Sequence, residues 1–463
     1  MSSRHLTKLL ATTCIAAAIP WLIVGCGGGG GSSTSSTAAT GSVTASVTDG
    51  PGDDYDHVWV TIKSIAFHTD ANQVWSAQDA TWQRYTLPTP ITVDLSNLTN
   101  GAMSQLLSGI QLPAGSYRQI RLFLAGYDDA LTSSAQTQGL TWNDQVTYTD
   151  NSSVVHNVPL EIPNPANGIP VSGTFDLAAG GSLNLVFDFD LEHDLVRFHH
   201  GTEDAFTLKP ELHYYDPAQS GAIVGRVDTS QFCTTSVGPG CMWNLIVKAE
   251  RLSDDQSRHV DVRATHVRAD GSFVLYPVVA NATYDLLIRG RNAETIVVKS
   301  VPVTAGATPS SSAATDLSSS PIVPTLASSG EYYAQLTSPL SPSSGWAVFQ
   351  QTLPGVGEVP YEVRWGNTNP FSGLLQNPMA LVNGPIHVAT YNGGSALSFN
   401  SATPLEGAGT YAVKTRALGY YDLSAAATLA PLVGTSQATP GTFTEAQPTL
   451  ASGVVAGTVT GSI

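Results

Sequence analysis

Stretches of alternating apolar and polar residues recur along this chain, and clusters of turn-forming residues separate them. In the clearest stretch, 182–191, the apolar positions are Leu183, Leu185, Phe187, Phe189 and Leu191. A two-residue period puts successive side chains on opposite faces of an extended strand. Charged residues make up only 12% of the chain, which argues against long solvated helices. The pattern therefore predicts a mainly β protein, with one plausible helix around 103–108.

The other face of the stretch 182–191 is acidic. It carries Asp188 and Asp190, and Glu192 follows directly. We therefore expect a strand with one buried face and one acidic face.

The N-terminus has the pattern of an export signal. Arg4 and Lys8 precede an apolar stretch, 9–24, that is shorter than a well-formed membrane span. The stretch ends in Ile23-Val24-Gly25-Cys26, which resembles the lipobox of bacterial lipoproteins. The resemblance implies that a diacylglycerol is attached to Cys26, that residues 1–25 are a signal peptide cut off just before it, and that the new N-terminus is acylated. The alternatives are an ordinary signal peptide and a lone anchor helix.

The residues after Cys26 predict a flexible tether. Positions 27–40 contain only Gly, Ser, Thr and Ala, so residues 26–40 combine the lipidated cysteine with a linker whose reach is about 20 Å. Gly27 stands where Asp would signal retention in the inner membrane. The lipoprotein resemblance therefore implies location at the outer membrane. The membrane is then one expected partner, bound through the lipid anchor.

The charge excludes one class of partner. The formal charge is −16, and loss of residues 1–25 leaves 18 basic against 36 acidic residues, or −18. A phosphate backbone needs a basic face, so we expect no nucleic-acid partner. The acidic balance suits a body held off an anionic membrane surface.

Two cysteines remain in the mature chain outside the lipobox. Cys14 leaves with the signal peptide, whereas Cys233 and Cys241 flank a Gly/Pro-containing loop. An exported protein favours a disulfide between them, and two free thiols are the alternative.

Several motifs in order resemble the family called domain of unknown function 4382. They are Thr48-Asp49-Gly50-Pro51, Val60-Thr61-Ile62-Lys63, Leu112-Pro113-Ala114-Gly115-Ser116-Tyr117, Asp188-Phe189-Asp190-Leu191 and Leu208-Lys209-Pro210. The resemblance covers about 41–216 and implies a β domain found in bacterial lipoproteins. It supplies no activity and no catalytic residues.

The rest of the chain predicts further β domains. Residues 220–304 carry Asp270-Gly271-Ser272-Phe273 and, after Asn281, the stretch 282–288, which together resemble the carboxypeptidase regulatory-like, or transthyretin-like, sandwich. That domain is an accessory in its family. The Ser/Thr/Ala-rich stretch 305–320 predicts a linker, and 321–463 a C-terminal β domain. The expected fold class is mainly β and multi-domain, with Ig-like or prealbumin-like β-sandwiches.

Acidic and histidine clusters are the candidate metal sites. The first lies in one turn and comprises Asp49, Asp53, Asp54 and Asp56. Such oxygen ligands suit Ca²⁺, the one cofactor considered, but a plain turn capped by Asp side chains is the favoured interpretation. The second comprises His193, His199, His200 and His213, near Glu192 and Asp194. Solvated loop histidines are the favoured alternative there.

Trp75 and Trp82 are the candidate binding residues, because tryptophan faces can stack on sugars. Core packing is the competing interpretation.

No nucleotide-binding, metalloprotease or serine-hydrolase motif occurs. We therefore expect a non-enzymatic envelope lipoprotein with a role in binding, adhesion or assembly, acting on an unknown protein or glycan ligand. One alternative is an exported hydrolase of envelope or extracellular glycans or peptides. The other is a structural spacer.

Overall fold

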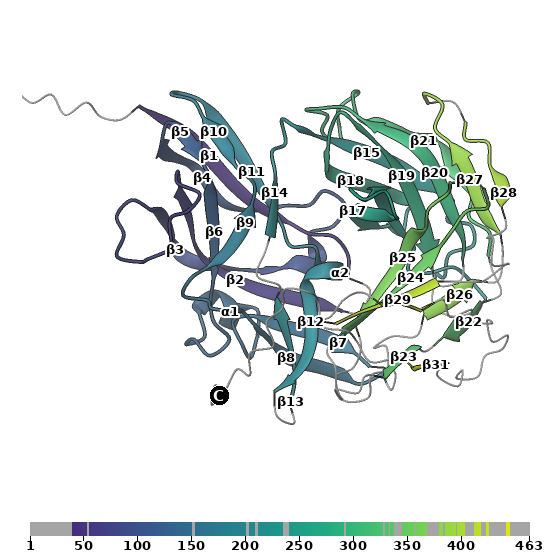
Figure 1. Ribbon diagram of the computed structural model, residues 1–463, viewed down its shortest axis with the longest axis horizontal. Helices are drawn as coiled ribbons and strands as arrows, with labels where there is room; N and C mark the ends of the chain where they lie inside the picture. Colours follow the sequence, from purple (N-terminus) through teal and green to yellow (C-terminus); the bar gives the residue numbers. More distant parts are fainter. Residues whose placement is uncertain are drawn as a thin grey trace, which may run out of the picture. The chain divides into compact units, whose positions relative to one another are not determined.

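The computed structural model describes residues 39–463 with gaps. The gaps are 53–54, 151–152, 201–202, 209–211, 235–239, 291–292, 327–328, 333, 338–344, 356, 368–378, 383–384, 395, 403–411, 418–422, 426–440 and 445–463. The described part is mainly β and contains several sheets, as the alternating pattern predicts (Figure 1). Cys26 and the tether lie outside the described residues, apart from positions 39–40.

The first part of the chain forms a sheet of twelve strands. They are β1 (Thr40–Thr48), β2 (His57–His68), β3 (Gln83–Asp94), β4 (Ser104–Pro113), β6 (Gln119–Leu124), β7 (Gln145–Thr149), β8 (Val155–Glu161), β9 (Ile169–Ser172), β11 (Ser182–Asp188), β12 (Leu195–His200), β13 (Glu203–Leu208) and β14 (Leu212–Tyr215). The short strands β5 (Gly115–Tyr117) and β10 (Phe175–Leu177) pair with each other. The described helices are also short: η1 (Leu95–Asn97), α1 (Ser133–Thr137) and α2 (Leu191–Asp194).

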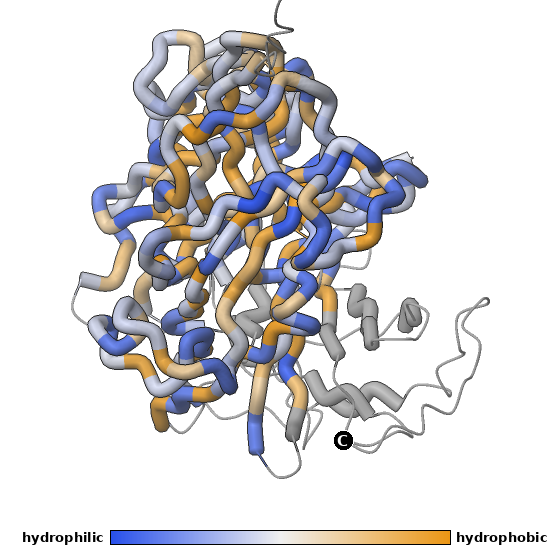
Figure 2. Tube along the Cα trace, turned by 90° about the vertical axis from the view of Figure 1, so that its left-hand side faces the viewer, coloured by the Kyte–Doolittle hydropathy of each residue, from blue (hydrophilic) through white to orange (hydrophobic). Residues whose placement is uncertain are grey.

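Strand β2 connects the two halves of this sheet. One edge pairs with β3, whereas the other pairs first with β7 and then with β6. Apolar residues at alternate positions of the strands point into one core, to which β1 contributes Val43, Ala45 and Val47, all fully buried. Figure 2 shows this alternation as orange and pale or blue segments that follow one another along the strands.

The predicted helix at 103–108 is wrong. Strand β4 occupies Ser104–Pro113 and pairs antiparallel with β1. The short apolar run suggested a helix. In the structure Leu106 and Leu107 are both buried, and the edge of β1 offers hydrogen-bond partners to the whole segment. Tertiary pairing decides the conformation of so short an apolar run.

The next part of the chain forms two facing sheets. One contains β15 (Ser220–Val227), β18 (Ser272–Val279) and β21 (Thr315–Ile322); the other contains β16 (Ile246–Leu252), β17 (His259–His266), β19 (Ala282–Gly290) and β20 (Ala293–Val303). The two sheets share one apolar core, in which Phe273, Leu275 and Leu286 are fully buried. The β domain expected at 220–304 is therefore present, with strands β15 to β20 inside it.

The stretch predicted as a linker, 305–320, differs from the prediction at its end. Residues from Thr315 onward belong to β21, which pairs parallel with β15 and buries Leu317 and Ile322 in the second core. Strand β15 orders this segment by pairing with it, and a Ser/Thr-rich composition does not reveal such a pairing.

The C-terminal strands do not all form a sheet of their own. Strands β27 (Ile386–Thr390) and β28 (Asn400–Ala402) extend the second domain's sheet through β20. A further sheet contains β24 (Gly345–Gln351), β25 (Tyr361–Asn367), β29 (Ala412–Ala417) and β30 (Leu423–Ala425). Two short pairs complete the described strands: β22 (Ser329–Tyr332) with β26 (Met379–Val382), and β23 (Ala334–Thr337) with β31 (Gly441–Thr444). The strand expected at 454–460 lies outside the described residues.

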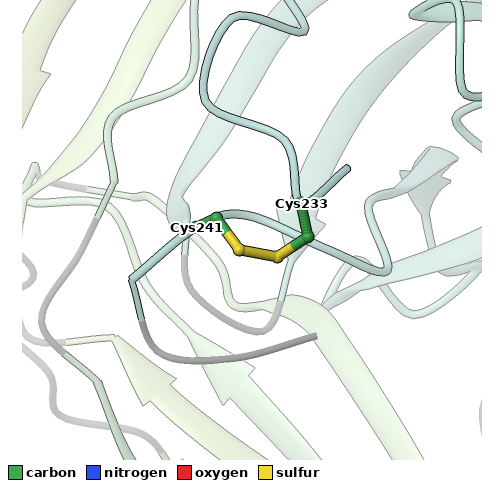
Figure 3. Close-up of a disulfide and its surroundings, with 2 residues drawn as sticks. All are labelled: Cys233 and Cys241. Atoms are coloured by element: carbon green, nitrogen blue, oxygen red, sulfur yellow. A yellow bond between two sulfur atoms is a disulfide. The ribbon is translucent and has the colours of Figure 1, made fainter. Parts of the chain in front are cut away.

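Cys233 and Cys241 form a disulfide, as Figure 3 shows. Their Cα atoms are 5.2 Å apart and eight positions separate them in sequence. The bridge therefore closes a single loop before β16.

Candidate functional site

The acidic end of β11 is buried where the first domain contacts the second. The strand ends at Asp188, and Asp190 takes a left-handed backbone conformation with φ of 44°. This turn breaks the alternation, so Phe189 and Leu191 stay in the apolar core while Glu192 and His193 face the neighbouring domain. We call the charged residues gathered here the junction.

Lys248 of β16 is at the centre of the junction. Its side chain is fully buried, and its Nζ lies 2.6 Å from Oε2 of Glu192 and 3.3 Å from Oδ2 of Asp261. Arg289 of β19 approaches the other oxygen of Glu192 at 3.8 Å. Buried charges of this kind are tolerated only when they are paired, so these contacts explain how an ammonium group fits inside the protein.

His193 connects two carboxylates in the same place. Its Nδ1 lies 2.8 Å from Asp190 and its Nε2 lies 3.1 Å from Asp261. Burial lowers the pKa of His193, but the two carboxylates more than offset this and hold the pKa well above its usual value. The ring packs edge-on against Trp365, with centroids 4.3 Å apart.

Arg263 of β17 forms the second ion pair of the junction. Its Nη1 lies 2.5 Å from Oδ1 of Asp188, and its Nη2 donates to the hydroxyl of Thr48 and the carbonyl of Asp49. The guanidinium is almost completely buried. It therefore binds the ends of β1 and β11 to the second domain.

Strand β25 adds a third segment to the junction. The backbone N–H of Trp365 donates to Oε1 of Glu192 at 3.1 Å, and that of Glu362 donates to Glu250. Figure 1 shows α2 beside β25. Three distant parts of the chain thus meet at one set of charges.

The charges of the junction balance without a metal ion. Burial raises the pKa of both Asp49 and Glu250 well above the usual range, so both favour the neutral acid. Around Lys248 and Arg263 four carboxylates face four cations: Asp188, Asp190, Glu192 and Asp261 face His193, Lys248, Arg263 and Arg289. Glu362 of β25 pairs with Arg258. Ligand atoms of Glu192, His193 and Asp261 lie within 4.8 Å of one another, but the Lys248 ammonium already bridges the two carboxylates. The arrangement suits an ion-pair network better than a metal site.

The acidic turn considered as a candidate calcium site does not bring its described carboxylates to common partners. Asp49 is fully buried and accepts the N–H of Leu191, whereas Asp56 accepts the hydroxyl of Thr149. Asp53 and Asp54 lie outside the described residues. Of the predicted histidines, His193 enters the junction and His213 lies on β14; the side chains of His199 and His200 are outside the description.

Trp75 and Trp82 pack against each other, with ring centroids 5.0 Å apart. Trp82 is buried beneath the loop, and the guanidinium of Arg121 lies 5.7 Å from its ring. Trp75 is half-buried, contacts Phe123 and donates its indole N–H to Ala166. The pair therefore pins the loop 69–82 onto the outer face of β2 and β6, and only Trp75 keeps an accessible surface.

Ser401, His387 and Glu294 form a second arrangement of chemically active groups. Ser401 Oγ lies 3.4 Å from Nδ1 of His387, whose Nε2 contacts Glu294. All three lie on neighbouring strands of one sheet, and Ser401 is the register partner of His387. Cross-strand adjacency alone explains the contact, and no oxyanion-binding group is placed beside Ser401 by these contacts.

Sequence reasoning missed the second domain's half of the junction. Lys248 and Glu250 alternate with apolar residues in β16, and Arg263 and Asp261 do so in β17. The sequence does carry a signal for this half of the junction: in both strands charged residues occupy every second position and apolar residues lie between them. Their burial depends on what covers that face.

No described helix is long and apolar enough to cross a membrane.

Comparisons with known proteins identify one part of the chain. Residues 40–210 match the family described as Domain of unknown function (DUF4382), and no curated protein matches. One similar solved structure is titled "Structure of the Streptococcal ancillary pilin". It shares 8% identity over 89% of this chain and 99% of that chain, with a TM-score of 0.16, which is too low to support an argument. The family match coincides with the motifs from Thr48 to Pro210 and with strands β1 to β13. Residues 40–210 of this chain are therefore a DUF4382 domain.

Proposed function

We propose that this protein is a lipid-anchored lipoprotein of the bacterial outer membrane whose β domains form a rigid arm for binding, adhesion or assembly. The junction carries the proposal. It joins the DUF4382 domain to the next domain and to β25 through buried ion pairs rather than through a flexible linker. Buried charges that must find defined partners favour one relative arrangement of the parts that supply them.

The second domain fits the role of an accessory in such an arm. We infer that residues 220–322 form a carboxypeptidase regulatory-like sandwich, because two sheets enclose a single apolar core in that region. The outer face of its larger sheet carries Lys248, Asp261 and Arg263, which receive the DUF4382 domain. A sandwich used in this way spaces and orients its neighbour.

Lipidation of Cys26 is the first prediction of this proposal. A fatty-acid analogue fed to producing cells should label the wild type and not Cys26→Ser, because only the lipobox cysteine accepts the lipid. Cys14→Ser is the matched control and should be labelled like the wild type, since Cys14 lies in the signal peptide. Equal labelling of the wild type and Cys26→Ser would reject the anchor.

Adhesion tests the role of the anchored arm. Cells making the wild type or Cys26→Ser are compared for retention of the protein in the outer-membrane fraction and for attachment to glycan-coated and protein-coated surfaces. We expect retention and attachment to fall together in Cys26→Ser. If the wild type is retained but attachment never exceeds that of cells lacking the protein, a binding role is rejected and a structural spacer is favoured.

A further inference from the structure

One lysine and two carboxyl groups of the junction are arranged for more than an ion pair. Lys248 Nζ is fully buried and lies 2.6 Å from Oε2 of Glu192 and 3.3 Å from Oδ2 of Asp261. Both carboxyl side chains are only 6% exposed. An amine held against a carboxyl group without intervening water is the geometry from which an amide can form.

The pKa values of the two carboxyl groups shift in opposite directions. Burial raises the pKa of Glu192 above its usual value, although the neighbouring charge of Lys248 acts to lower it. Burial also acts to raise the pKa of Asp261, but His193 and Lys248 more than offset this and hold it well below the usual range. Glu192, the closer carboxyl at 2.6 Å, is the one suited to be attacked. Asp261 stays ionised, and the hydrogen bond that it accepts from Nζ places it to relay a proton.

Glu192 also has a donor for the charge that an attack would create. The N–H of Trp365 donates to Oε1 at 3.1 Å, on the oxygen that does not face Lys248, and Arg289 lies 3.8 Å from the same atom. Donors placed in advance at a developing oxyanion are a main source of rate enhancement in acyl transfer. The leaving oxygen, Oε2, is the one that faces the amine.

We propose that Lys248 and Glu192 become joined by an intramolecular amide bond, with Asp261 as the proton carrier. Nζ of Lys248 gives up a proton to Asp261 and attacks Cδ of Glu192, and the negative charge develops on Oε1 beside Trp365. The C–Oε2 bond then breaks. Of the three ammonium protons two leave with Oε2 as water, one of them by way of Asp261, and one stays on the amide nitrogen. The condensation needs no oxidant, reductant or further reactant.

One feature of the surroundings slows the reaction and two favour it. The carboxylates raise the pKa of Lys248 although burial lowers it, so the amine is protonated at rest. A slow reaction is sufficient, because it need occur only once in each molecule. Fixed proximity of the reacting atoms replaces the entropy cost of an encounter, which in model reactions corresponds to effective molarities of about 10⁵–10⁸ M. The amide also removes two charges from a buried site. It would link the DUF4382 domain covalently to β16, across 56 residues of sequence.

Peptide mapping of the full protein purified from producing cells tests the proposal directly. After reduction and digestion with trypsin and a second protease, we expect a branched peptide containing Glu192 and Lys248 that lacks the mass of one water. Trypsin should not cleave after Lys248, because its amine is acylated. Recovery of both peptides unlinked, with complete cleavage after Lys248, would overturn the proposal.

A matched pair in the same molecule provides the control. Lys63 Nζ lies 2.9 Å from Asp129 but both side chains are solvent-exposed, so trypsin should cleave fully after Lys63 and no link should form there. In Asp261→Asn we expect the linked fraction to fall at least about tenfold, because a general base commonly contributes a factor of about 10²–10⁴. Undiminished linkage in folded Asp261→Asn would overturn the role assigned to Asp261, and the wild-type map decides the bond itself even if that variant does not fold.

Discussion

Replacing Lys248 by Met is expected to lower the free energy of unfolding by about 3–5 kcal/mol, because it removes the ammonium that bridges two buried carboxylates. Glu192 and Asp261 both contact Nζ in the native protein, and each carboxylate is only 6% exposed, so hydration can replace little of the lost contact. Met keeps the length and much of the volume of the lysine side chain. The loss therefore reports the charge, or the covalent link that the charge pair precedes, rather than a cavity.

Urea unfolding followed by circular dichroism measures the effect, with Lys63→Met as the matched control. Lys63 pairs with Asp129 at a similar distance, but the two side chains are 34% and 50% exposed. Exposed pairs contribute about 0–1 kcal/mol, so the control should change stability little. Equal, small losses in both variants would show that the junction does not hold the domains together.

The second large effect concerns pH. The stability of the protein should fall as the pH rises from about 5 to about 8, with a slope of up to about 1.4 kcal/mol per pH unit for each group that holds an extra proton when folded. Burial raises the pKa of Asp49, so above the unfolded pKa the folded chain binds more protons than the unfolded chain. The free energy of unfolding then declines until the pH passes the folded pKa. Glu250 and His193 act with the same sign.

Asp49→Asn separates this contribution from the others. The amide is neutral at every pH, and its oxygen can still accept the N–H of Leu191. We expect thermal melts of this variant to depend less on pH than those of the wild type between about pH 5 and about pH 8.

Asp79→Asn is the matched control, because hydrogen bonds from Thr81 lower the pKa of this partly exposed carboxyl. Its contribution is lost only as the pH falls below the usual range of Asp, so the slope between about pH 5 and about pH 8 should be unchanged. An identical pH slope in wild type and Asp49→Asn would mean that Asp49 is ionised in the folded protein.

The sequence predicted the strands well where each strand had one apolar face. The alternating stretch 182–191 became β11 over most of its length, and the β domain expected at 220–304 contains strands β15 to β20, because alternation places the apolar side chains in a core. The prediction was wrong at 104–108 and differed at 315–320, where the signal was a short apolar run or a Ser/Thr-rich composition. In both places an open strand edge elsewhere in the chain decided the structure.

The candidate site, too, could be predicted from the sequence only in part. The acidic residues from Asp188 to Glu192 stood out in the sequence, but their burial could not be inferred from it. A charged strand face is compatible with solvent or with a complementary face of another domain. The choice depends on which surfaces meet, and no local pattern encodes that.

The sequence by itself determined that the chain is mainly β, that a DUF4382 domain follows the N-terminal tether, and which two cysteines of the described part form a disulfide. Only the tertiary structure decided that Glu192 meets Lys248, 56 residues away, and the backbone of Trp365, 173 residues away. Alternation is a local property, fixed by the geometry of one strand. Charge pairing across a domain boundary is set by the packing of separate sheets, and burial then makes each pair obligatory because an unpaired charge there would cost several kcal/mol.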